Sequence, residues 1–210
     1  MQLLDLLLPA KCTICGVSGA IVCEPCQTKF CPRSFDISRN NFDGYAATNY
    51  SDDVAKMIYE YKERGQTSLA KFFARFMAPR IAKYSSTDAI LVPVPSGRSA
   101  TTIRGFEPAK ILAAHLSRQT KLPTLAALTL KIEAADQATL NRQQRLLNLQ
   151  NGMVGSNVLR GKSVILVDDI VTTGATLAEA RRAVHEAGGR AIFFATFAET
   201  ILKNQHIEVV

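Results

Sequence analysis

The chain lacks a long basic block, a membrane-length apolar run and any cysteine beyond residue 31. Its 210 residues carry a formal net charge of +7, but no five basic residues stand together, so the charge is diffuse. Such a balance favours phosphorylated ligands or nucleic acid through long-range attraction, without choosing between them. No stretch approaches the roughly 20 apolar residues of a membrane helix, so we expect no membrane insertion.

The N-terminus also lacks the features of an export signal. Leucines cluster between Leu3 and Leu8, but Asp5 interrupts them and no basic residue precedes them. All five cysteines fall within residues 12 to 31, and none lies in the remainder of the chain. That usage is typical of a reducing compartment, which predicts a cytoplasmic protein.

The clustered cysteines form two CxxC pairs, Cys12 with Cys15 and Cys23 with Cys26, separated by seven residues. Four thiolates from two such pairs can surround one tetrahedral ion, and zinc suits them best. A redox pair or a disulfide knot is the competing interpretation. Because the segment has little apolar bulk, metal binding would supply its folding free energy. Cys31 either replaces one ligand or is a buried thiol.

The remainder of the chain alternates strand and helix patterns. We expect an N-terminal segment of residues 1–40, with a short helix and the zinc ribbon, followed by an α/β domain of residues 41–210. Pro79 should disturb or end the second predicted helix. The expected elements are an edge strand or hairpin arm at 42–47, helices at 53–62, 68–83, 108–118 and 177–187, and strands at 89–95, 163–167 and 191–198.

The most informative stretch runs from Ser163 to Leu177. Residues 164–167 are apolar at every position, as in a parallel strand covered on both faces. Asp168 and Asp169 follow, and then come the small residues Thr172, Thr173, Gly174, Ala175 and Thr176, just ahead of a helical pattern. Open α/β sheets place their ligands at this end of a strand.

These residues predict two adjacent subsites with different chemistry. Small residues at a helix N-terminus offer amides and hydroxyls to a phosphate. The two carboxylates repel phosphate and suit sugar hydroxyls, or a divalent cation held partly through water. A ligand with a terminal phosphate, a ribose diol and a metal-bound second phosphate group meets all three demands. The stretch closely resembles the 5-phosphoribosyl-1-pyrophosphate (PRPP) signature of type I phosphoribosyltransferases.

A second loop follows the strand predicted at 89–95. Ser96, Gly97 and Arg98 form a turn whose amides and guanidinium can contact pyrophosphate. Arg104, followed by Gly105, lies on a segment that we expect to be mobile and to fold over a bound ligand as a hood. The alternative is a loop of solvated arginines.

Taken in order, these motifs resemble the ComF family, small phosphoribosyltransferase-like proteins with an N-terminal zinc ribbon. The chain departs from the family pattern in two ways. The family commonly has a further cysteine pair, of which this chain keeps only Cys31. The family also has a row of arginines in the segment between Pro95 and Arg104, and this chain lacks that row. The resemblance includes Leu7, Leu8, Pro9, Cys12, Tyr61–Gly65, Val92–Pro95, Arg104–Phe106, Gln137, Leu140, Arg142, Arg145, Asn148 and the loop from Asp168 to Thr176.

The resemblance implies a twisted, mainly parallel sheet with helices on both faces and a small zinc-ribbon appendage. It implies binding of PRPP, or of a nucleotide 5-monophosphate, with Mg²⁺. Three functional classes stay open: an enzyme that transfers the phosphoribosyl group to an acceptor, a nucleotide sensor without turnover, and an accessory factor in DNA uptake during natural competence. The last would bind single-stranded DNA or a helicase partner.

Overall fold

The computed structural model describes residues 10–29, 35–131 and 152–200, and their centre is a five-stranded sheet of order β1-β2-β7-β6-β3. Strands β2, β7, β6 and β3 are parallel, and β1 is antiparallel at one edge. The strand bounds are Phe35–Arg39 (β1), Phe42–Asn49 (β2), Ile90–Pro93 (β3), Ser163–Val171 (β6) and Arg190–Glu199 (β7).

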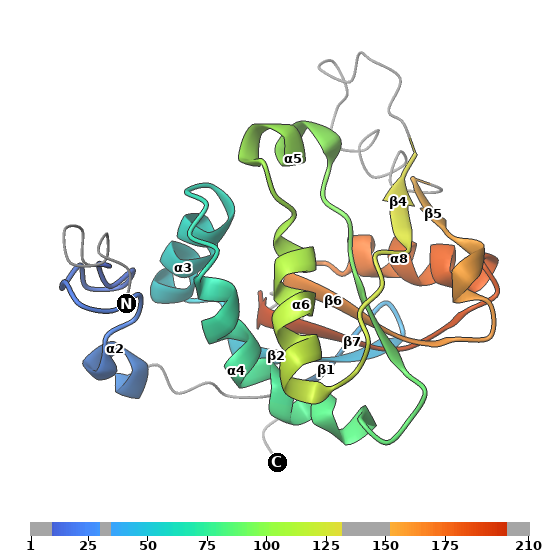
Figure 1. The fold of residues 1–210 in the computed structure, drawn as a ribbon, viewed down its shortest axis with the longest axis horizontal. Helices are drawn as coiled ribbons and strands as arrows, with labels where there is room; N and C mark the ends of the chain where they lie inside the picture. The colour runs from blue at the N-terminus through green and yellow to red at the C-terminus, as the bar shows by residue number, and fades with distance from the viewer. Residues whose placement is uncertain (1–9, 30–34, 132–151, 201–210) are drawn as a thin grey trace.

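Helices cover both faces of this sheet (Figure 1), as the sequence predicted. The alternation along β6 produces the two cores, because successive strand residues point to opposite faces. Ile165 and Val167 pack with α3, α4 and α6, whereas Val164 and Leu166 pack with α8. The helices are Asp52–Lys62 (α3), Leu69–Ile81 (α4), Pro108–Thr120 (α6) and Ala175–Glu186 (α8).

The two-residue turn between β1 and β2 has both residues in the left-handed region, Asn40 at φ 52° and Asn41 at φ 55°. Asparagine tolerates this conformation, and the pair matches the turn that suits strand twist in a tight hairpin. The expectation of a hairpin arm at 42–47 is confirmed. The alternative of an edge strand is wrong, because β1 pairs with β2 and takes the edge. The sheet thus begins at Phe35, before the expected boundary at residue 40.

Several predicted boundaries differ from the structure around the PRPP-like motif. α8 begins at Ala175 rather than at residue 177, so Ala175 and Thr176 belong to its first turn and not to the loop before it. β6 runs to Val171, so Asp168 and Asp169 lie within the strand rather than after it, and pairing with β7 continues to Glu199. Residues 98–104, expected as a loop, form the short helix α5 (Arg98–Arg104), which projects beyond the sheet in Figure 1. α5 ends at Gly105, whose φ of 73° suits glycine.

Pro79 does not break α4 where it stands. The helix continues two residues beyond it, to Ile81, and then tightens into a 3₁₀ turn, Ala82–Tyr84. A proline in the last turn removes a single donor, which is tolerated close to a helix end. The prediction of a nearby helix end is therefore confirmed, but not a break at the proline.

Two small units flank the sheet and lie on opposite sides of it in Figure 1. The cysteine-bearing segment includes the short helix α2 (Glu24–Lys29), and its Cys12, Val22 and Cys26 join the core formed with α3 and α4. On the other side, β4 (Leu128–Leu130) and β5 (Met153–Gly155) form an antiparallel ribbon. Within the described ranges, no helix has both the length and the apolar character needed to cross a bilayer.

Candidate functional site

The loop Thr172–Gly174 joins the end of β6 to the first residue of α8. Gly174 takes φ 80°, a left-handed conformation that side-chain-bearing residues rarely adopt, and serves as the N-cap of α8. Thr172 and Thr173 are exposed, and Thr176 is half-buried. Among the described residues, the amides of Gly174 and Thr176 donate no hydrogen bond. Free amides at the start of a helix attract an anion.

The two acids of the motif lie in different environments, although they are adjacent. Asp169 is buried, with a side chain only 1% exposed, whereas Asp168 is half-buried. Asp168 Oδ1 accepts a hydrogen bond from the amide of Asp169 at 2.9 Å. Burial, and then the charge of Asp169, raises the pKa of Asp168 to about 8. The pair therefore carries less than two full charges near neutral pH.

Lys62, at the end of α3, supplies the counter-charge to this pair. Its Nζ lies 2.8 Å from Asp169 Oδ1, while Asp169 Oδ2 has no hydrogen-bond partner in the described part of the chain. Burial lowers the pKa of Lys62, but the charges of Asp169 and Asp168 raise it more, so the ammonium stays charged. A buried carboxylate oxygen without a partner is costly unless a ligand supplies one.

The residues on either side of Lys62 tie α3 to the second loop. The hydroxyl of Tyr61 donates to Pro108 O, at the start of α6, at 2.6 Å. Glu63 Oε1 pairs with Arg104 Nη2 at 2.6 Å. Three consecutive residues thus fix α3 to α6, β6 and α5. In the sequence, Tyr61–Gly65 stands out only through the family resemblance, so Lys62 was not among the predicted site residues.

The second predicted loop begins at the same edge of the sheet as the acids. Pro93 pairs with Val167, and the amide of Val94 donates to Val167 O at 2.9 Å. Ser96 and Gly97 therefore follow β3 directly beside the strand that carries Asp168. The structure brings the two predicted loops to one edge, but it ties Arg104 to Glu63 rather than leaving it as a free cation.

A cavity of about 430 Å³ opens beside this second loop, between α5, α6 and β4. Ser96, Thr101 and Thr129 supply hydroxyls to its wall, and Lys110 supplies a charge. Lys110 is itself paired with Glu107 at 2.7 Å. The cavity has the mixed polar and apolar lining typical of a small-molecule site.

The four predicted zinc ligands also come together. The Sγ atoms of Cys12, Cys15, Cys23 and Cys26 all lie within 4.8 Å of one another, and those of Cys15 and Cys23 are 3.5 Å apart. The amide of Cys23 donates to Cys12 Sγ at 3.4 Å. Tetrahedral Zn–S bonds of about 2.3 Å place sulfurs roughly 3.8 Å apart, so this cluster has the dimensions of a metal site.

Three features of the sequence analysis fall outside the described residues. The short helix expected at the N-terminus falls on the leucine cluster of residues 3–8, within the segment 1–9. Cys31 lies in the segment 30–34, and the pair Arg142 and Arg145 lies in 132–151. The sequence did not indicate Arg39 and Glu199, which form a buried ion pair. Arg39 Nε also donates to Thr172 O, in the loop Thr172–Gly174. The Asn40-Asn41 pair was the one local signal for the hairpin that carries Arg39; nothing local indicated its partner.

The fold and the loop after β6 define a phosphoribosyltransferase-like domain, and residues 69–208 match the phosphoribosyl transferase domain. Competence protein ComFC of Bacillus subtilis (strain 168) is 28% identical over 181 residues, which is 84% of this chain and 72% of that protein. DNA utilization protein YhgH of Escherichia coli (strain K12) is 25% identical over 150 residues, 69% of this chain and 66% of that protein.

Orotate phosphoribosyltransferase from Aeropyrum pernix has a TM-score of 0.35 and 14% identity, with 81% of this chain and 73% of that chain covered. A score this low adds nothing to the assignment, which rests on the domain match and the named relatives. The chain belongs to the ComF family of phosphoribosyl transferase domain proteins.

Proposed function

We propose that this chain binds PRPP, or a nucleotide 5-monophosphate, together with Mg²⁺, and transfers the phosphoribosyl group to an acceptor. The observation that carries the proposal is the contrast across two adjacent subsites. Amides and hydroxyls at the start of α8 attract an anion. Near the end of β6, Asp169 Oδ2 is a buried acceptor that has no donor among the described residues. A phosphorylated ribose offers a phosphate to the first and a hydroxyl donor to the second.

In this assignment the loop Thr172–Thr176 holds the 5-phosphate. Asp168 and Asp169 accept hydrogen bonds from the ribose hydroxyls. Ser96, Gly97 and Arg98 contact the pyrophosphate from the neighbouring strand. Arg104 also contacts the pyrophosphate. To do so it exchanges its ion pair with Glu63 for the pyrophosphate, which carries more negative charge. Thus each end of the ligand meets a different strand of the same sheet edge.

Mg²⁺ fits this site because carboxylate oxygens and bound water are its preferred ligands. Asp168 and Asp169 would hold it together with the ligand's own oxygens. When bound, the ion supplies positive charge that stabilises the leaving pyrophosphate.

The chain's own residues position the ligand and stabilise charge. In the transfer, the bond from ribose C1 to pyrophosphate breaks and a bond from C1 to the acceptor forms. Lys62 pairs with Asp169 and fixes the orientation of its carboxylate. The carboxylates favour the positive charge that develops on the ribose, and the second loop favours the negative charge on the pyrophosphate.

We propose a structural Zn²⁺ held by Cys12, Cys15, Cys23 and Cys26. The spacing of the four sulfurs and the amide donated to Cys12 support this assignment. Because Cys12 and Cys26 are part of the core shared with α3 and α4, the metal would also stabilise the packing of this segment on the domain. Four reduced thiolates suit the cytoplasm, where we place the protein.

Pyrophosphate release tests the transfer. Purified protein is incubated with PRPP, Mg²⁺ and single nucleobases or amines, and released pyrophosphate is measured against the Asp169→Asn variant. We expect one acceptor class to raise release by about tenfold or more over the rate without acceptor. If the protein binds PRPP but no acceptor stimulates pyrophosphate release, the protein is a sensor of PRPP rather than a transferase.

A second candidate is an accessory role in DNA uptake, because relatives are named competence and DNA utilization proteins. One face of α4 and α6 is locally basic. Burial, then the charges of Arg118 and Lys71, lowers the pKa of His115. Arg75 lies one turn from Lys71 on the same helix. Single-stranded DNA affinity at two salt concentrations, with Lys71→Glu as the test variant, separates this role from the first.

A further inference from the structure

Arg39, the last residue of β1, is a buried arginine whose side chain is 3% exposed. A guanidinium removed from water is stable only when ion-paired and fully hydrogen-bonded. Its aliphatic stem lies against Thr172–Thr176, the segment assigned to the 5-phosphate and called the phosphate loop from here on, since a Cβ added to Gly174 would stand 2.5 Å from Arg39 Cβ. The contacts of Arg39 therefore bear on the shape of that loop.

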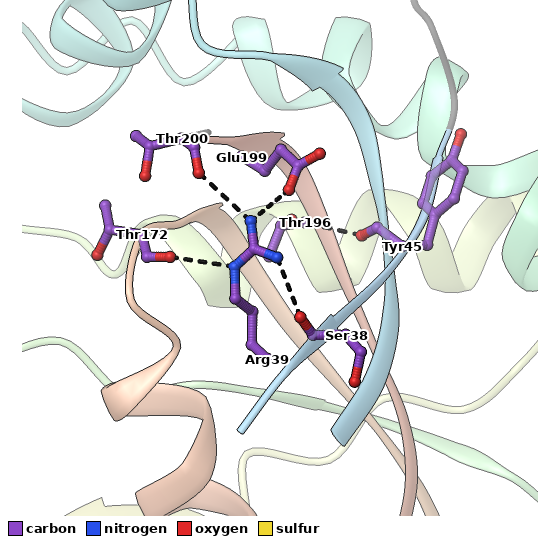
Figure 2. Close-up of polar contacts among 7 residues, drawn as sticks. All are labelled: Ser38, Arg39, Tyr45, Thr172, Thr196, Glu199 and Thr200. Atoms are coloured by element: carbon purple, nitrogen blue, oxygen red, sulfur yellow. Dashed lines mark hydrogen bonds and ion pairs between the residues drawn. The ribbon is translucent and has the colours of Figure 1, made fainter. Parts of the chain in front are cut away.

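Figure 2 shows that this guanidinium joins three segments of the chain. Nη2 contacts Glu199 Oε2 at 2.5 Å and donates to Thr200 O at 3.3 Å, at the end of β7. Nε donates to Thr172 O at 3.3 Å, immediately after β6. Nη1 donates to Ser38 O at 3.0 Å within β1. Each of the three guanidinium nitrogens therefore donates at least one hydrogen bond within the protein.

These contacts cross the sheet rather than follow it. β1 is separated from β6 by β2 and β7 in the strand order, yet Arg39 reaches the residue that follows β6. Asn40, the next residue in the hairpin, extends the contact, because its Nδ2 donates to Thr173 O at 3.3 Å. Two consecutive hairpin residues thus hold two consecutive carbonyls of the loop.

The direction of these bonds has a consequence for the amides. When Thr172 O and Thr173 O accept bonds from the hairpin, the following amides turn away from it, because the C=O and N–H of a trans peptide unit point in opposite directions. Those amides belong to Thr173 and to Gly174, the N-cap of α8. Gly174 completes the turn at φ 80°, directly above the stem of Arg39.

We propose that Arg39, oriented by Glu199, is a positioning residue that presets the phosphate loop for its anion. The proposal rests on the assignment of Thr172–Thr176 to the 5-phosphate. Arg39 acts through geometry rather than charge, because Glu199 neutralises it. Lysine cannot replace it, since one ammonium lacks the planar fork that serves carbonyls on three segments at once.

The test compares two ligands that use different parts of the site. Ribose 5-phosphate requires the loop, whereas magnesium pyrophosphate is assigned to Ser96–Arg98. Affinities for both are measured by titration calorimetry with Arg39→Lys, Arg39→Met and Glu199→Gln, beside thermal unfolding. Arg80→Met is the matched control, because Arg80 pairs with Asp36 on the same strand β1 at 2.7 Å, away from the loop.

We expect Arg39→Lys and Arg39→Met to weaken ribose 5-phosphate binding by about tenfold or more, with magnesium pyrophosphate changed by less than about threefold. Glu199→Gln keeps the side-chain shape and should weaken ribose 5-phosphate binding less than either arginine variant. Arg80→Met should leave both affinities unchanged. If Arg39→Met does not fold, Arg39→Lys and Glu199→Gln carry the comparison.

Unchanged ribose 5-phosphate affinity in the folded Arg39 variants would overturn the proposal while leaving the phosphate site in place. Equal losses for both ligands would also overturn it, since general destabilisation would then be the cause. Failure of the wild-type protein to bind ribose 5-phosphate would remove the phosphate assignment and, with it, the role of Arg39.

Discussion

Lys62 Nζ on α3 lies 2.8 Å from Asp169 Oδ1 on β6, and the carboxylate is 1% exposed. The pair joins α3 to the strand that carries Asp168 and Asp169. It leaves Asp169 Oδ2 directed at no partner among the described residues. A carboxylate oriented by one ion pair, with an oxygen that still lacks a partner, can accept a ligand hydroxyl without rearranging.

Removing Lys62 should therefore destabilise the protein. Lys62→Met leaves an unpaired buried carboxylate, and we expect the free energy of unfolding in urea to fall by about 2–4 kcal/mol. Lys56→Met is the matched control on the same helix, because the 3.8 Å pair of Lys56 with Asp53 is exposed, and it should change stability by less than about 0.5 kcal/mol. Equal effects from the two variants would contradict a special role for Lys62.

The raised pKa of Asp168 predicts a pH dependence of stability. The folded pKa of about 8 exceeds the model-peptide value of 3.8, so the folded state binds the proton more tightly than the unfolded state. The contribution is fully present below the unfolded pKa and is lost as pH rises toward 8. Urea unfolding should show wild-type stability declining over this window relative to Asp168→Asn. Parallel curves for the two proteins would exclude the shift.

Gly174 should tolerate alanine worse than another glycine with positive φ. At Gly174 an added Cβ meets Arg39, whereas at Gly161, with φ 71°, it meets nothing within 4 Å. Gly161→Ala should cost roughly 1 kcal/mol of backbone strain, and Gly174→Ala should cost more and weaken ribose 5-phosphate binding. Calorimetry and urea unfolding measure the two effects. Similar losses at both positions would mean that the contact with Arg39 relaxes freely.

The cysteine cluster predicts about one zinc per chain by elemental analysis of purified protein. Cys15→Ser should lose most of the metal and destabilise the segment that packs on α4. Cys31→Ser, which leaves the four proposed ligands in place, should keep it. Full zinc content in Cys15→Ser, or none in the wild type, would contradict the assignment.

The sequence predicted the parts of the site that are contiguous. The apolar run of β6, the acids and the small-residue loop are local, so their order alone indicates a strand, a turn and a helix start. It did not predict that Asp168 and Asp169 differ, because their burial depends on α3. In the sequence, Lys62 has the pattern of an ordinary helix residue, because nothing local shows that it forms an ion pair with Asp169, more than 100 residues later.

Arg39 was missed for a related reason. A five-residue edge strand with polar residues has a weak pattern, and its partner in the ion pair is 160 residues away. α5 was taken for a loop because Ser96, Gly97 and Gly105 suggested turns at both ends. A helix of only seven residues fits between them and is fixed by the pair of Arg104 with Glu63.

The central claim is that the strand-end acids and the loop together bind PRPP. Titration calorimetry with PRPP, with and without Mg²⁺, compares the wild type with the double variant Asp168→Asn/Asp169→Asn, and sulfate serves as a probe of the loop alone. The account predicts Mg²⁺-dependent PRPP binding that weakens at least about tenfold in the double variant, while sulfate binding persists. If the double variant binds PRPP as tightly as the wild type, the acids do not bind the ligand and the central claim is wrong. Loss of sulfate binding in the same variant would further contradict the assignment of the phosphate to the loop.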